Sequence, residues 1–154
     1  MNMKTRRRLL VLVANAVLFA PQILRATDVG PEVFAAISAA DIDQDELIYV
    51  RRPVIVFADL PNDPNYIRQM EYLGLIHEDL QRRDVVLITD TDPAHPSELR
   101  KRLRPRGFTL VLMDKGWDSA LRKPLPWQGR EIINAIDKMP IARAEAFERN
   151  PSGR

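Results

Sequence analysis

Two continuous apolar runs constrain the fold of this chain more than any other feature of its sequence. The first is PVIVFA (Pro53–Ala58) and the second is VVLIT (Val85–Thr89). Runs rich in β-branched residues, without alternating polar side chains, are typical of strands buried on both faces. Such strands occur in parallel sheets that carry helices on both sides. The sequence therefore predicts an α/β fold.

The segment between these runs has the pattern of a helical crossover. It begins with Asp63-Pro64, a carboxylate suited to a helix N-cap followed by proline at the first helical position. Apolar side chains then recur at the helical period, which predicts one helix ending near Arg82-Arg83. These side chains are Tyr66, Met70, Leu73 and Leu80, flanked by Ile67 and Ile76. A right-handed crossover of this kind makes the two strands parallel.

The C-terminal half predicts four more elements. SELRKRL (Ser97–Leu103) reads as a short helix with a serine cap, and FTLVLM (Phe108–Met113) as a third strand. A fourth strand is expected from Ala120 to Arg122, and a last helix over Arg130–Lys138 that Pro140 ends. The order βαβαββα is that of a thioredoxin-like core, a mixed four-stranded sheet with helices on both faces.

The rest of the chain is expected to flank one domain. The core spans residues 53–141, and residues 27–52 form a leader with a short helix, predicted over Pro31–Ala40. Residues 142–154 form a polar tail that we expect to fray beyond Phe147.

Residues 1–26 have the pattern of a bacterial signal peptide. Lys4–Arg8 is basic, Leu9–Ala20 is apolar but too short to span a bilayer, and Ala26 suits a cleavage site. Thr5–Leu10 also resembles a twin-arginine export signal. We therefore expect a periplasmic protein without a transmembrane segment after cleavage. An uncleaved anchor is the alternative.

The charge distribution argues against a nucleic-acid-binding protein. The formal net charge is +2, but the first 26 residues hold five of the cations and no acid. The remainder carries 18 basic and 21 acidic residues, a net charge of −3. Nucleic-acid binding requires a concentrated basic surface. The basic run RKRLRPR (Arg100–Arg106) is therefore interpreted as a solvated helix face that pairs with acids, with anionic lipid or glycan binding as the alternative.

Cysteine is absent from the chain. Thiol–disulfide oxidoreductases and thiol peroxidases attack through a thiolate, so the sequence excludes both activities. No cofactor is expected. Whether the chain is an enzyme of another kind stays open, and the sequence favours binding over catalysis.

Several motifs together resemble a known family over roughly residues 40–147. They are RPVIVFAD, RRDVVLITDTDP, LRPRGFTLVLMDK, LRKPLPW and REIINAIDKMP. The family comprises secreted bacterial proteins known as a domain of unknown function, thioredoxin-like and lacking the active-site cysteines. It is similar to the domain of the animal sushi-repeat-containing proteins. The resemblance implies a thioredoxin-like fold and no established activity. The family tends to read Lys-Asp-Gly-Gly or Lys-Asp-Gly-Glu where this chain has Lys115-Gly116-Trp117-Asp118.

The first candidate site is the edge where a thioredoxin holds its redox motif. Alignment places Asn62 and Asn65 at the two cysteine positions, and Gly107-Phe108-Thr109 at the Gly-x-Pro motif. A cis bond is not expected before Thr109, since a non-proline cis peptide costs about 3 kcal/mol. The remaining helix N-terminus suits an anion or a carbonyl-bearing peptide. The alternative is that Asp63 only caps the helix.

The second candidate site is acidic. Asp59 follows the first strand, and Asp90 and Asp92 follow the second. Since the carboxyl ends of parallel strands meet at one edge, these side chains, with Asp63 and His95, could hold Ca²⁺ or Mg²⁺ or support metal-dependent hydrolysis. Asp-x-Asp-Pro is also an ordinary turn motif, and both interpretations stay open.

Four further side chains are given structural roles. Arg52 and Arg122 are expected to anchor buried carboxylates, and Trp127 to close the core beside the last helix. Trp117 lies in a predicted turn, where an exposed ring would indicate a contact surface.

The sequence thus favours a non-redox binding module of the bacterial envelope that docks a protein or peptide at the former active-site edge. The alternative is a metal-binding or metal-dependent hydrolytic protein.

Overall fold

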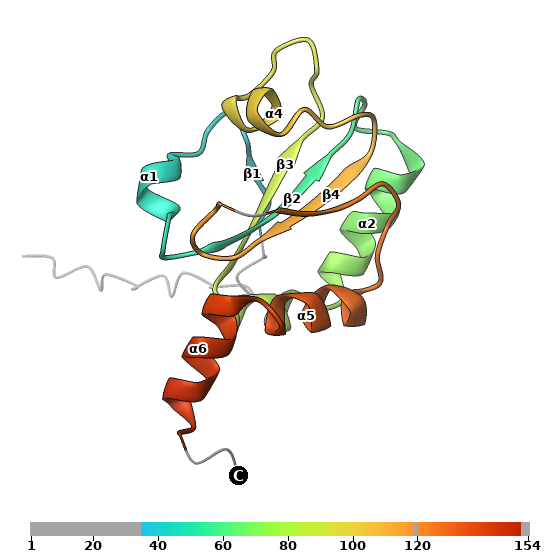
Figure 1. Ribbon diagram of the computed structural model, residues 1–154. Helices are drawn as coiled ribbons and strands as arrows, with labels where there is room; N and C mark the ends of the chain where they lie inside the picture. Colours follow the sequence, from blue (N-terminus) through green and yellow to red (C-terminus); the bar gives the residue numbers. More distant parts are fainter. Residues whose placement is uncertain (1–34, 119, 152–154) are drawn as a thin grey trace, which may run out of the picture. The chain divides into compact units, whose positions relative to one another are not determined.

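The computed structural model describes residues 35–118 and 120–151, and the predicted signal peptide lies outside them. Five strands form one sheet in the order β1-β3-β2-β4-β5 (Figure 1). They are β1 (Ile37–Ser38), β2 (Arg52–Phe57), β3 (Val85–Asp90), β4 (Thr109–Met113) and β5 (Ala120–Lys123). The central strand β2 runs parallel to β3 and antiparallel to β4. β1 adds in parallel to β3, and β5 in antiparallel to β4.

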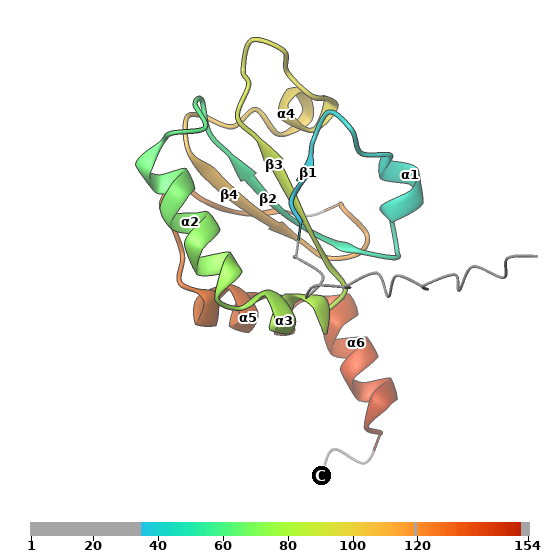
Figure 2. The same cartoon turned by 180° about the vertical axis from the view of Figure 1, so that it is seen from behind.

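Helices cover both faces of this sheet (Figure 2). One face carries α2 (Pro64–Gly74), α3 (His77–Gln81) and α5 (Gly129–Asp137), and the other carries α1 (Gln44–Leu47) and α4 (Glu98–Leu103). A final helix, α6 (Pro140–Arg149), follows α5. The fold is thioredoxin-like, as predicted from the order of elements. The sheet has five strands rather than the predicted four, because β1 adds to the open edge of β3. In the described residues no helix has the length and apolar character needed to cross a bilayer.

The two-sided burial of β2 explains its continuous apolar sequence. Val54 and Val56 pack into the core beneath α2, α3 and α5, whereas Ile55 and Phe57 pack into the core beneath α1 and α4. Because successive side chains of a strand point to opposite faces, both sets must be apolar. The predicted strands at residues 53–58 and 85–89 are therefore confirmed.

The helix predicted over Pro31–Ala40 is wrong in its described part. Ile37–Ser38 forms strand β1, with Ile37 aligned to Ile88 of β3. The alanines around it favour a helix intrinsically, but pairing with the open edge of β3 overrides this preference. A short helix forms later instead, at α1, where the Asp43 carboxylate accepts the N–H of Asp45 at 3.0 Å.

The single helix predicted after Pro64 is divided into α2 and α3. α2 ends at Gly74, and α3 starts three residues later at His77. Ile76, in the break, packs so closely on Gly129 that a Cβ there would lie 2.5 Å from Ile76 Cγ2. Glycine at the start of α5 therefore allows this contact between the two segments.

Pro140 begins α6 rather than ending the chain's last helix. α5 stops at Asp137, close to the predicted end, and Pro140 then occupies the first turn of α6, where its missing N–H costs nothing. α6 extends through Arg149, so residues expected in a polar tail are helical.

Both tryptophans pack into the cores of the domain. Trp127 packs against the core beside α5, as expected. Trp117 is not an exposed turn residue, since its side chain is only 4% exposed and belongs to the core beneath α4. Its backbone has φ of 55°, and its indole Nε1 donates to the Arg51 carbonyl at 2.9 Å.

Arg52 anchors buried carboxylates, as predicted. Arg52 is 1% exposed, and its guanidinium donates from Nε to Asp114 at 3.0 Å, from Nη1 to the Arg83 carbonyl at 2.8 Å, and from Nη2 to Glu145 of α6 at 2.5 Å. Arg122 does not do the same, because its Nη1 donates to the Leu103 carbonyl instead.

The Arg52 cluster extends across the start of β2 and holds α6. Lys115 Nζ lies 2.8 Å from Asp84 Oδ2 and 2.7 Å from Glu145 Oε1. Asp114 Oδ2 also accepts the N–H of Ile141, in the first turn of α6, at 2.6 Å. Burial acts to raise the pKa of Glu145, but hydrogen bonds from Lys115 and Arg52 outweigh it and hold that pKa below its ordinary value.

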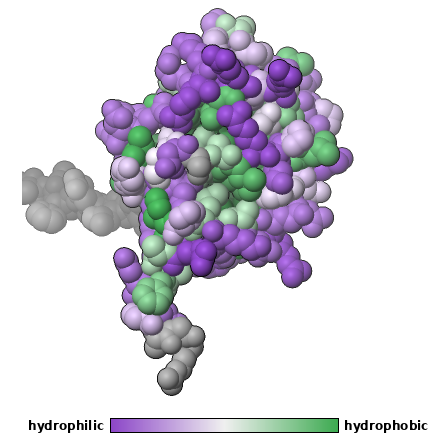
Figure 3. All heavy atoms as spheres, in the orientation of Figure 1, coloured by the Kyte–Doolittle hydropathy of each residue, from purple (hydrophilic) through white to green (hydrophobic). Residues whose placement is uncertain are grey.

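β5 forms one edge of the sheet, and most of its side chains are exposed. Figure 3 shows hydrophobic surface on this side of the molecule, between α4 and α5, with hydrophilic side chains around it.

The lowered pKa of Glu145 predicts acid sensitivity at the α6 contact. A carboxylate whose folded pKa is depressed stabilises the fold fully above its ordinary value, 4.5 here, and loses that contribution as the pH falls through its folded value. We expect Glu145→Gln to flatten the fall in Tm between about pH 5 and pH 3. Circular-dichroism melts across this range measure the effect.

The matched control is Glu148→Gln, an exposed glutamate on the same helix. Equal acid dependence in the two variants would contradict the assignment.

Candidate functional site

The carboxyl ends of β2 and β3 lie side by side, with Phe57 aligned to Asp90. A buried arginine from α4 closes this end of the sheet. Arg100 Nε donates to Asp90 Oδ1 at 2.8 Å, and its Nη2 donates to the carbonyl oxygens of Ala58 at 2.7 Å and Asp90 at 2.9 Å. Its guanidinium also lies 5.4 Å from the centre of the Phe57 ring. One side chain thus satisfies carbonyls that follow or end both strands.

Arg100 corrects the interpretation of the basic run. The run was expected to form a solvated helix face, but Arg100 is only 7% exposed. Its neighbour Lys101 does behave as expected, since it is exposed and its Nζ lies 2.6 Å from Glu98 Oε1. The serine cap is confirmed as well, because Ser97 Oγ accepts the N–H of Arg100 at 3.1 Å.

The three aspartates of the predicted metal site have different partners. Asp90 is buried, and Ser97 Oγ donates to its Oδ2 at 2.6 Å while Arg100 takes its Oδ1. Asp59 is exposed, 3.7 Å from Arg100 Nη1. Asp92 lies in the following loop, and its Oδ2 is 2.8 Å from His95 Nδ1, a hydrogen bond that lowers the pKa of Asp92. In the part of the chain that the structure describes, no three carboxylate or histidine side chains gather as metal ligands.

Asp63 caps α2, and this changes what the helix N-terminus can bind. Its Oδ1 accepts the N–H of Asn65 at 2.7 Å and of Tyr66 at 3.3 Å. The free N–H groups expected there are therefore partly used, and the cap adds a negative charge. An anion is disfavoured at this end of the helix, contrary to the expectation from sequence.

The loop before β4 lies beside the end of β2, as the first candidate site requires. Thr109 is aligned to Phe57, and a Cβ on Gly107 would lie 3.9 Å from Asp59 Oδ2. Gly107 has φ of +55°, which glycine adopts without strain. The described residues contain no cis peptide bond, in agreement with the expectation for Thr109. Phe108 is 6% exposed and belongs to the core, so it cannot present its ring to a partner.

Two apolar residues at this edge were missed from the sequence. Leu60 is 61% exposed in the loop after β2, and Ile67 is 45% exposed in the first turn of α2. They flank the exposed Asn62. The helical period had assigned Ile67 to the margin of the buried stripe, and only the structure shows how much of it reaches solvent.

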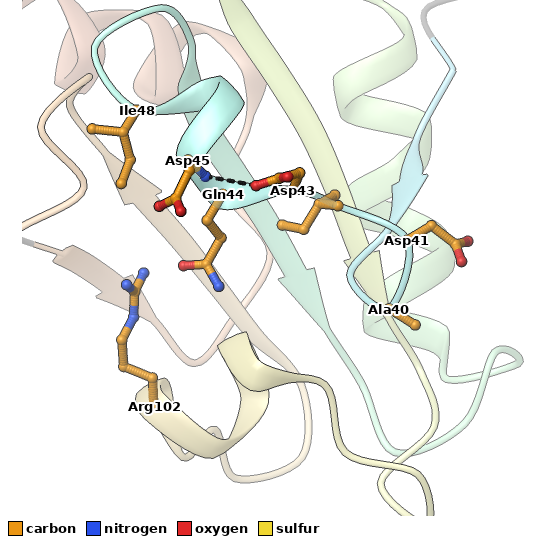
Figure 4. Close-up of a pocket in the computed structure, with 8 residues that line it drawn as sticks. Ala40, Asp41, Asp43, Gln44, Asp45, Ile48 and Arg102 are labelled. Atoms are coloured by element: carbon orange, nitrogen blue, oxygen red, sulfur yellow. Dashed lines mark hydrogen bonds between the residues drawn. The ribbon is translucent and has the colours of Figure 1, made fainter.

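A separate open hollow of about 610 Å³ lies between the α1 region and α4. It is lined by Ala40, Asp41, Ile42, Asp43, Gln44, Asp45, Ile48 and Arg102. Figure 4 shows the Asp43 carboxylate turned to the backbone of Asp45 as a helix cap and Asp41 directed away from it. Asp43 caps α1, and the carboxylates of Asp41, Asp43 and Asp45 do not converge on one point.

The two aspartates next to β3 predict a sharp contrast in stability. Asp90→Asn removes the buried counter-charge of Arg100 and leaves only the exposed Asp59, 3.7 Å away, which costs about 3 kcal/mol or more and lowers Tm by roughly 10 °C. Asp92→Asn is the control, since Asp92 is exposed in the loop that follows β3, and we expect little change in the Tm of this variant. Thermal melts with and without Ca²⁺ or Mg²⁺ measure both. A metal-dependent rise in Tm that Asp90→Asn abolishes would instead support the metal site.

The sequence was compared with family models, curated proteins and solved structures. The sequence matches no curated protein. Among solved structures, the chain is similar to one titled "Crystal structure of chloroplastic thioredoxin z defines a novel type-specific target recognition", with 19% identity and a TM-score of 0.45 over 58% of this chain and 81% of that chain. Residues 45–145 match the family model described as "Domain of unknown function (DUF4174)", which covers more than half of the sequence. The chain therefore belongs to the DUF4174 family of domains of unknown function.

Proposed function

We propose that this protein is a non-redox binding module that docks a protein or peptide at the former active-site edge. The surface consists of Leu60, Asn62, Asp63, Asn65, Ile67, Gly107 and Thr109. The observation that carries the proposal is the exposure of Leu60 and Ile67 in an otherwise polar loop and helix turn. Burying one such side chain against a partner is worth about 1.5–3 kcal/mol.

The contacts of Asp63 favour a peptide over a small anion. Its carboxylate satisfies the first N–H groups of α2 and would repel an anion placed there. A polypeptide partner needs neither of those N–H groups. It can cover Leu60 and Ile67 and bond to the exposed Asn62 amide instead.

The polar groups near this edge support binding rather than catalysis. Without cysteine there is no thiol nucleophile. The Ser97 hydroxyl is buried and donates to Asp90, which is itself held by Arg100. His95 is exposed and paired with Asp92, and no described hydroxyl lies within hydrogen-bond distance of its ring. The Ser97 hydroxyl thus stabilises the fold, and the His95 ring has no hydroxyl nearby that it could activate.

The partner would be met in the bacterial envelope. This part of the proposal rests on the signal-like residues 1–26 and on the resemblance of the sequence motifs to a family of secreted bacterial proteins. Both point to a protein that works outside the cytoplasm.

Partner capture tests the binding edge. We expect the tagged wild-type chain, expressed in a bacterial envelope, to retain a partner that Leu60→Asp and Ile67→Asp lose by at least about tenfold, because each buries a charge in an apolar contact. Quantitative mass spectrometry of the captured proteins measures the loss.

Leu75→Asp is the matched control, since Leu75 is 83% exposed directly after α2, at its opposite end. All three variants should melt like the wild type. Equal capture by the edge variants and the control would reject this edge as the binding surface.

A reporter fusion tests export separately. Alkaline phosphatase joined to residues 1–30 should become active in the periplasm, and Leu12→Asp with Leu18→Asp should abolish this by breaking the apolar stretch. Replacing Arg6 and Arg7 by lysine distinguishes twin-arginine from general export. Reporter that stays cytoplasmic with the unaltered segment would refute an envelope location, and reporter retained in the membrane would indicate an uncleaved anchor.

A further inference from the structure

The edge strand β5 offers unpaired backbone to solvent. It pairs with β4 on one side only, where Leu110 is aligned to Lys123 at one end and Met113 to Ala120 at the other. Nothing in the described chain pairs with its other side. An open edge of this kind is a template for one more strand. Leu121 is 39% exposed on it, and Leu125, just beyond, is 64% exposed.

The side of β5 that faces α4 is cationic with an apolar base. A hollow of about 510 Å³ lies there, with Leu103, Met113 and Trp117 in its lining, and Arg102 and Arg122 also line it. Within the described residues neither arginine forms an ion pair, and Arg122 donates only to the Leu103 carbonyl at 2.6 Å. Asp118 lines the same hollow without pairing with either of them. The hollow thus presents two guanidinium groups that form no ion pair within the described residues, together with one carboxylate, that of Asp118. Arg102 also lines the neighbouring hollow that contains Asp41, Asp43 and Asp45.

The side of β5 that faces α5 is mainly apolar, and its one strand cation, Lys123, lies with its Nζ 4.0 Å from the centre of the Trp127 ring. A smaller hollow of about 150 Å³ lies there, lined by Leu112, Leu121, Ala135, Met139 and Pro140, with Asp114 and Lys138 at the same hollow. Alternation along the strand explains the difference, because Arg122 is aligned to Val111 of the α4-side core and Leu121 to Leu112 of the α5-side core. Figure 3 shows the apolar surface on this face framed by hydrophilic side chains.

We propose that β5 accepts an extended peptide with alternating acidic and apolar side chains as a sixth strand of the sheet. Successive side chains of an added strand point to opposite faces. The acidic ones then face Arg102 and Arg122, and the apolar ones face Leu121 and the hollow beside α5. Backbone hydrogen bonds to the open edge supply affinity, and the two hollows supply selectivity.

A second copy of this chain fits the same edge less well. Antiparallel pairing of β5 with itself brings Arg122 and Lys123 of one copy near those of the other, and like charges across a strand pair are destabilising. An acidic peptide removes that conflict. The surface also contains none of the residues proposed to bind a partner at the former active-site edge, so either proposal can fail alone.

A designed peptide tests the proposal directly. The probe is a fluorescein-labelled hexapeptide of three Val-Glu repeats, titrated with the full-length chain and followed by fluorescence anisotropy. We expect saturable binding of this peptide and none of a Val-Lys peptide of equal length. Arg102→Glu should weaken binding at least about tenfold by turning attraction into repulsion. The same reversal at Arg143, exposed on α6, should leave binding unchanged.

Backbone pairing needs its own measurement. N-methylation of alternate peptide residues keeps every charge and side chain but removes N–H donors, so it should abolish binding if the methylated residues face β5. The opposite alternation should have little effect. Hydrogen exchange of residues 120–123 should slow when the unmethylated peptide is bound. Absence of binding at millimolar peptide, equal binding of the Val-Lys peptide, or indifference to both methylation patterns would overturn the proposal.

Discussion

The buried guanidinium of Arg52 organises the amino-terminal end of the sheet. Arg52 is the first residue of the central strand. Its guanidinium donates to the Arg83 carbonyl after α3, to Asp114 directly after β4, and to Glu145 of α6. Removing a buried charge of this kind from its partners costs several kcal/mol. Arg100 has the same function at the opposite end of β2 and β3. One arginine thus bonds to the central strands at each end, and the two proposed binding edges lie outside these clusters.

Much of the fold could be predicted because its signals are local. Val54–Val56 and Val85–Ile88 are apolar on both faces, and Asp63 and Ser97 cap helices through hydrogen bonds within three residues. Features that depend on distant partners could not be predicted. Ile37 forms a strand because β3 has an open edge. Arg100 of α4 is buried because it bonds to Asp90, which lies ten residues earlier at the end of β3.

The candidate site shows the same division. The position of Thr109 and Gly107 near the end of β2 could be predicted, because the succession of strands and helices in the sequence implies that the third predicted strand pairs with the first. The sequence does not reveal that Asp90 is neutralised by Arg100, that Phe108 is buried, or that Leu60 and Ile67 are exposed. Those facts depend on side-chain packing, which composition and periodicity do not encode.

The shortness of β1 has a mechanical consequence. Only Ile37 and Ser38 pair with β3, and Ala39 adds one backbone bond to the Thr89 carbonyl at 2.9 Å. Tension applied at Ile37 therefore loads these few bonds first. They would yield well before β2, which is hydrogen-bonded on both sides and buried on both faces. A pull at Ile37 would detach one short strand and leave the strands bound by Arg52 and Arg100 and the β5 edge intact.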